Sequence, residues 1–120
     1  MRFSRILIVF VALLLFVGVA SAENKLGIRD VSRVTFVAPI RVGGALLPAG
    51  DYLVRHTMEG ENHIMVFESV KTKTVEAKAH CNLVPLTEKA TQSKTVYEMN
   101  ANERILQELV FRGDTAKHVF

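Results

Sequence analysis

The stretch from Val42 to His56, read as V-G-G-A-L-L-P-A-G-D-Y-L-V-R-H, constrains the fold of this chain more than any other. Gly43 and Gly44 interrupt one extended run, and Pro48 with Gly50 predicts a turn, because proline presets the backbone at the second turn position and glycine suits the fourth. Apolar and polar residues alternate after Gly50, beginning with Tyr52, as in a half-buried strand. The stretch therefore predicts a structural motif that turns one strand into the next, and it implies no reaction.

The amino-terminal residues have the three parts of a secretory signal peptide. Arg2 and Arg5 precede a near-continuous apolar run over 6–19, and Ala20-Ser21-Ala22 supplies small residues for cleavage. The alternative is a retained membrane anchor, but the apolar run is shorter than the roughly 20 residues that span a bilayer. We expect a signal peptide over 1–22 and an exported chain, periplasmic or secreted.

Removal of this segment changes the charge of the chain. The full sequence has 15 basic and 12 acidic residues; without Arg2 and Arg5, 13 basic residues remain against 12 acidic ones, a net charge of +1. No run of Lys or Arg is left, so composition argues against nucleic acid as a partner. Residues 23–120 are enough for one small domain, and the single Cys81 cannot form an internal disulfide.

Several short extended runs with turn signals between them predict an all-β fold without helices. The runs cover 31–39, 40–42, 45–47, 51–70 as a hairpin, 75–83, 94–100, 103–112 and 115–120. Glu103–Arg112 is also compatible with a helix, but the neighbouring strands and the Asn100-Ala101-Asn102 turn signal favour a strand. We expect an antiparallel β-sandwich or small barrel of about seven short strands.

The hairpin over 51–70 allows two registers. A two-residue loop at Glu59-Gly60 would place His56 opposite His63, and this is the register we favour. A four-residue loop would instead place Met58 opposite His63. Glutamate fits poorly at the positive dihedral angle that a two-residue turn demands, which argues for the alternative.

The motif F-x-x-P-x-x-V-G-G-x-x-L-P-A-G-x-Y-x-V over Phe36–Val54 resembles a recurrent pattern in small exported bacterial all-β proteins of uncharacterised function. The segment Leu47–Tyr52 is also similar to a strand entry in prealbumin-like and surface-adhesin B-type sandwiches. Both resemblances imply a β-sandwich used for binding or as a structural element. Neither implies a catalytic residue or a cofactor.

His56 and His63 are the candidate metal ligands, because cross-strand imidazoles can reach one ion, with Glu61 as a third ligand. The alternative is two partly solvated histidines at the end of a sheet, since no H-E-x-x-H or C-x-x-C spacing is present. Cys81 lies among apolar residues of an alternating strand, and this pattern predicts a core position. The adjacent His80 points to the opposite face and cannot activate it.

The sequence favours a non-enzymatic exported module that binds a partner protein or an envelope or surface component. We expect the binding surface at an exposed sheet edge or at the loops 59–62 and 87–94. The alternative is a small-ligand or metal carrier that uses His56 and His63. An enzyme of unknown type is the third hypothesis, although no nucleophile-elbow, P-loop or dinucleotide motif occurs.

Overall fold

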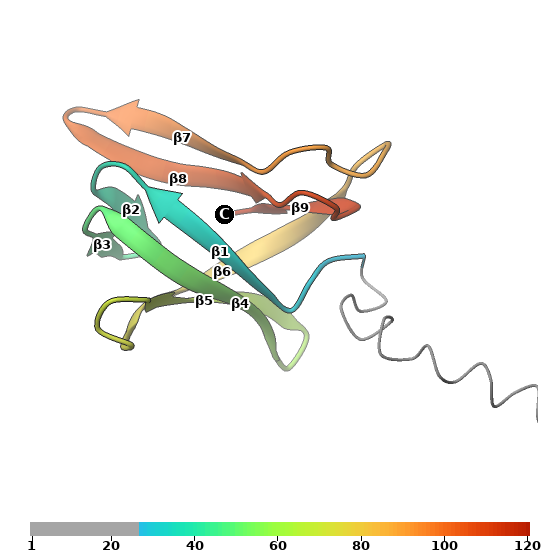
Figure 1. The fold of residues 1–120 in the computed structure, drawn as a ribbon, viewed down its shortest axis with the longest axis horizontal. Coiled ribbons are helices and arrows are strands. Elements are labelled where there is room, and N and C mark those ends of the chain that lie inside the picture. The colour runs from blue at the N-terminus through green and yellow to red at the C-terminus, as the bar shows by residue number, and fades with distance from the viewer. Residues whose placement is uncertain (1–26) are drawn as a thin grey trace, which may run out of the picture.

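The structure is a computed structural model that describes residues 27–120. These residues form nine strands and no helix (Figure 1). The strands are β1 (Val31–Phe36), β2 (Ile40–Val42), β3 (Ala45–Leu47), β4 (Gly50–Glu59), β5 (Asn62–Ser69), β6 (Val75–Pro85), β7 (Lys94–Asn100), β8 (Glu103–Val110) and β9 (Ala116–Val119). The all-β prediction is confirmed, with nine strands in place of about seven. The predicted signal peptide over 1–22 lies outside the described residues.

The strands form one open sheet in the order β1-β4-β5-β6-β9-β8-β2-β3, and β7 also pairs with β8. Every pairing is antiparallel except that of β2 with β8. The long strand β6 belongs to both halves of this sheet, because its first part pairs with β5 and residues 82–85 pair with β9. The sheet therefore turns at β6, and the two halves face each other.

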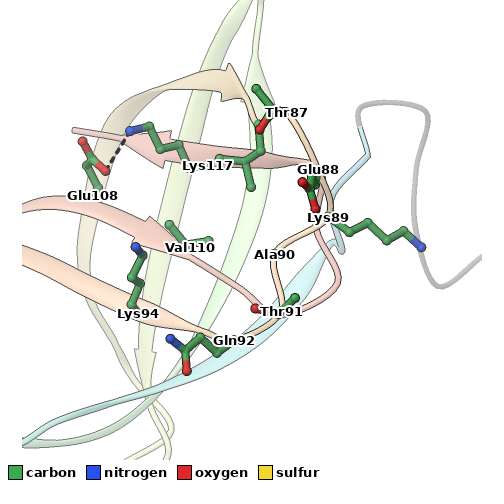
Figure 2. A pocket seen from close by; sticks show the side chains of 11 residues that line it. Thr87, Glu88, Lys89, Ala90, Thr91, Gln92, Lys94, Glu108, Val110 and Lys117 are labelled. Atoms are coloured by element: carbon green, nitrogen blue, oxygen red, sulfur yellow. Dashed lines mark hydrogen bonds and ion pairs between the residues drawn. The ribbon is translucent and has the colours of Figure 1, made fainter.

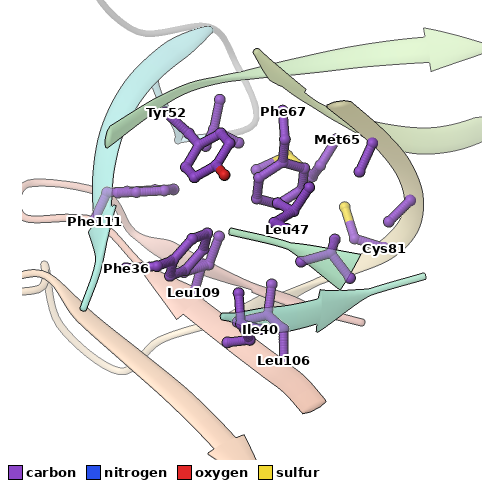
Figure 3. Packing of buried hydrophobic residues seen from close by; sticks show 14 residues of the cluster. Phe36, Ile40, Leu47, Tyr52, Met65, Phe67, Cys81, Leu106, Leu109 and Phe111 are labelled. Atoms are coloured by element: carbon purple, nitrogen blue, oxygen red, sulfur yellow. The ribbon is translucent and has the colours of Figure 1, made fainter. Parts of the chain in front are cut away.

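The core fills the space between these two halves (Figure 3). Alternation supplies it, since successive strand residues point to opposite faces. The half formed by β1 and β4 to β6 contributes Phe36, Tyr52, Val54, Met65, Phe67, Ala77, Ala79 and Cys81; the other half contributes Ile40, Val42, Leu47, Leu106, Leu109 and Phe111. The alternation expected over 75–83 places Val75 on the same inward face as Cys81, but Val75 is 56% exposed, because the β5–β6 ladder slips between Phe67 and Glu68.

The predicted structural motif forms two turns. Gly43, with φ of 61°, and Gly44 connect β2 to β3, and Gly50, with φ of 149°, begins β4. Both φ values lie in a region that side chains other than glycine rarely adopt. The buried Tyr52 hydroxyl donates a 2.6 Å hydrogen bond to the Pro48 carbonyl oxygen. Tyr52 in β4 therefore also stabilises the turn that precedes this strand.

The register that we favoured for the β4–β5 hairpin is wrong. His56 pairs with Met65 and His63 pairs with Met58, as in the alternative register, and the ladder continues one pair further to Glu59 and Asn62. The turn therefore consists of Gly60 and Glu61, and Gly60 has a φ of 66°. The reason is the requirement for a positive φ, which places glycine rather than Glu59 at the first turn position.

The ambiguous segment over 103–112 is a strand, as expected, and β8 ends at Val110. It forms a hairpin with β7 through a turn in which Ala101 has a φ of 59°. Pairing with β7, β9 and β2 prevails over the helix propensity of its leucine and glutamate residues. No helix within residues 27–120 is long and apolar enough to cross a membrane.

Candidate functional site

The predicted metal ligands His56 and His63 lie in direct contact. They come from β4 and β5 and are diagonal neighbours on the inward face of the sheet, not directly opposite as we expected. His56 Nε2 lies 2.9 Å from His63 Nδ1, and the ring centroids are 5.0 Å apart. This is a hydrogen bond between two imidazoles, in which one ring donates and the other, neutral, ring accepts.

A third imidazole, His118 of β9, joins this pair. Its ring centroid lies 5.9 Å from that of His56 and 5.7 Å from that of Phe111. The side chain is buried, and its Nδ1 has no hydrogen-bond partner among the described residues. We assigned His118 no role from the sequence. Residues alternate in β9, so His118 points to the same side as the buried Ala116, and this pattern could have indicated an inward position.

Burial favours the neutral form of two of these histidines, His56 and His118. Desolvation, and then the neighbouring His56 and His63, lower the pKa of His118 to about 4. The pKa of His56 is lowered too, mainly by desolvation and then by His63, against an opposing effect of Asp30. A neutral imidazole can be a metal ligand, and the lowered pKa values keep His56 and His118 in this form at neutral pH.

The third ligand predicted for the metal site is not brought to the pair. Glu61 is exposed in the β4–β5 turn. Among residues 27–120, no group of three or more His, Cys, Asp or Glu side chains is arranged to hold a metal ion. Cys81 pairs with His63 across the β5–β6 ladder, but it is fully buried, and burial raises the pKa of its thiol to about 11. It therefore stays a thiol and packs in the core, as the alternation predicted.

The loop that we expected to bind a partner covers a hollow of about 370 Å³ (Figure 2). Two hydrogen bonds hold its backbone: Ala90 N donates to Asp114 O over 3.0 Å, and Gly113 N donates to Ala90 O over 2.9 Å. The Lys117 ammonium lies 3.0 Å from the Glu108 carboxylate at the edge of the hollow. The other predicted loop, over 59–62, is only a tight turn whose Glu59 forms an ion pair with Lys78.

The hollow leads into a groove between β1 and β7. Lys94 and Val110 line both. Three adjoining hollows form this groove. Each is lined by residues of β1 or of the segments beside β1, and also by residues of β7, β8 or the turn after β8. Figure 1 shows β1 running beside β8 and β7 on the side away from β4. We refer to this feature as the β1–β7 groove.

The two strands that border the β1–β7 groove are both sheet edges. Strand β1 pairs only with β4, and β7 pairs only with β8 among the described strands. The sides of the groove are apolar where Val34, Phe36, Val110 and Phe111 line it. At the far end, Val37 is 83% exposed and Tyr97 42% exposed, so apolar surface without a covering partner is present there.

No protein-family model, curated protein or solved structure matches this chain. The resemblance to small exported all-β proteins therefore stays a prediction from the motif over Phe36–Val54. A function for this chain must accordingly be inferred from its own geometry.

Proposed function

We propose that this chain is an exported, non-enzymatic β-sandwich module that binds an extended segment of a partner protein in the β1–β7 groove. The observation that carries the proposal is the presence of two unpaired strand edges on opposite sides of one groove with apolar walls. An extended segment would add a strand there, so that main-chain hydrogen bonds supply affinity and alternate side chains supply specificity.

The direction of the two edges supports this proposal. The antiparallel pairings from β1 through β4, β5, β6, β9 and β8 to β7 give β1 and β7 the same sense. A single inserted strand can therefore run antiparallel to both. Antiparallel pairs have the more favourable hydrogen-bond geometry, and closure would remove both free edges.

The free edge of β1 has identifiable hydrogen-bonding groups. His56 N donates a 2.9 Å hydrogen bond to Asp30 O, and the register pairs Ser32 with Val54. In an antiparallel ladder, hydrogen-bonded and non-hydrogen-bonded pairs alternate. The backbone groups of Val31, Arg33 and Thr35 therefore point away from β4, towards the groove, and are available to an added strand.

Removing one of these backbone donors tests the proposal. We expect Arg33→Pro to weaken binding of a nine-residue peptide of alternating glutamine and valine by about five- to tenfold, because a net hydrogen bond is worth about 1 kcal/mol. The matched control, Arg33→Ala, keeps the N–H and loses the same ion pair with Asp51. Calorimetric titration of both variants, with melting curves to verify folding, gives the comparison; equal affinities would contradict strand addition at β1.

A metal carrier is the second candidate, and the 2.9 Å contact between His56 and His63 favours it. On this hypothesis, native mass spectrometry of the exported chain in the presence of zinc should detect one retained ion. The double variant His56→Ala, His63→Ala should lose it, whereas His80→Ala, an exposed histidine on β6, should keep it. Absence of a retained ion would contradict the carrier hypothesis. Strand addition predicts that peptide binding is unchanged in the double variant, because neither histidine lines the groove.

A further inference from the structure

The charged residues that line the β1–β7 groove are all of one sign. They are Arg29, Arg33, Lys94, Arg104 and Arg112, and no carboxylate is among the lining residues of its three hollows. Glu98 of β7 is not one of these lining residues. We propose that the segment bound in this groove is acidic, with aspartate or glutamate alternating with apolar residues. This inference depends on the function proposed above and specifies its partner.

Most of these cations are available to a ligand. Arg33 forms an ion pair with Asp51 over 2.7 Å, and the Arg104 guanidinium lies 4.8 Å from the centre of the Tyr97 ring. Within residues 27–120, Arg29, Lys94, Arg104 and Arg112 form no ion pair. A carboxylate that enters the groove would therefore gain a cation without displacing a carboxylate of the protein.

This excess of positive charge is local. The chain from residue 23 has 13 basic and 12 acidic residues, so its overall charge does not produce it. The other ion pairs join cations outside the groove to Glu103, Glu68, Glu59 and Glu108. A cleft with charges of one sign favours ligands of the opposite sign and increases their rate of association.

The apolar walls indicate a polypeptide rather than a polyanionic polymer. Val34 and Phe36 of β1 are two residues apart, which is the repeat of side chains on one face of a strand. An added strand in register would direct every second side chain to this apolar face and the others to solvent, beside the cations. A charged polymer without apolar groups would leave the walls uncovered.

Four nine-residue peptides separate these contributions: alternating Glu/Val, Gln/Val, Lys/Val and Glu/Ser. We expect the exported chain to bind Glu/Val about tenfold more tightly than Gln/Val, because several exposed ion pairs of ordinary strength add to about this factor. Lys/Val should bind more weakly than Gln/Val. The preference for Glu/Val should diminish in 0.5 M salt, since salt screens charges at the surface.

Charge variants of the protein supply the control. Arg29→Gln with Arg112→Gln should reduce the preference for Glu/Val over Gln/Val by at least threefold, since two of the groove's cations are removed. Lys71→Gln with Lys73→Gln makes the same change in net charge at exposed lysines outside the groove, and should leave the preference unchanged.

The outcomes distinguish this inference from the proposed function. Equal binding of Glu/Val and Gln/Val would overturn the acidic preference while strand addition stands. Binding of neither peptide would overturn both. If Glu/Ser binds as tightly as Glu/Val, the groove is a site for polyanions in general, and the inference that the bound segment carries alternating apolar residues is wrong.

Discussion

Replacement of Tyr52 by alanine is expected to reduce the free energy of unfolding by about 3–5 kcal/mol, the usual cost of deleting a buried aromatic ring. The side chain is 2% exposed, and its ring centroid lies 5.6 Å from that of Phe36. Alanine removes this packing and also the 2.6 Å hydrogen bond that closes the turn at Pro48. Because a small domain has only about 5–15 kcal/mol in total, this variant should be close to unfolding.

Urea denaturation of two further variants shows how much of this loss of stability is due to the Tyr52 ring, how much to its hydroxyl and how much to the burial of the ring. Tyr52→Phe keeps the ring and removes the hydroxyl, so it should lose about 1 kcal/mol. Tyr97→Ala removes a 42% exposed ring on the edge strand β7 and should lose about 1 kcal/mol or less. A loss in Tyr52→Ala no larger than that in Tyr97→Ala would show that the turn and the core do not depend on Tyr52.

Acidification from pH 7 to pH 4 is expected to destabilise the fold by about 3 kcal/mol through His118 alone. The pKa of this buried imidazole is about 4 in the folded chain, against an ordinary value of 6.5. Between these values the unfolded chain binds the proton and the folded chain does not, so stability decreases as the pH falls through this window. The contribution of His118 to stability is fully present above pH 6.5. The lowered pKa of His56 acts in the same direction.

Urea unfolding at pH 7, 6, 5 and 4.5 measures this effect. The carboxylates of Asp51 and Glu103 also have lowered pKa values, but their ordinary values of 3.8 and 4.5 place their main contribution at lower pH. His118→Phe should flatten the dependence between pH 6.5 and 4.5, because phenylalanine has no proton to bind. His80→Gln, at an exposed position, should not. An unchanged slope in His118→Phe would refute the assignment.

Local patterns predicted the strands of this fold well. The bounds of β2, β3 and β7 agree with the expected ranges, and alternation placed Tyr52, Val54 and Cys81 inside the core. These features depend on neighbours two residues apart and on glycine or proline at turns, which can be read from one sequence. The β4–β5 register depended on a finer choice between two turn positions, and there the preference of Gly60 for a positive φ decided against our expectation.

The candidate site was less predictable because it is nonlocal. Alternation could place His118 inward, but its contact with His56 depends on how the sheet turns at β6. The β1–β7 groove brings together Thr35 and Thr95, residues far apart in the chain, at strand edges that have no pairing to reveal them. Its cations are scattered singly along the sequence, and only the fold collects them in one groove.

The most direct test of strand addition is backbone amide exchange of the protein with and without the Gln/Val peptide. We predict slower exchange on binding at Val31, Arg33 and Thr35, whose N–H groups face the groove, and along the free edge of β7. The amides of Ser32 and Val34, which already face β4, should change less, and those of the remote edge strand β3 should not change. Protection at β3, or saturating peptide that leaves Arg33 unprotected, would contradict the account.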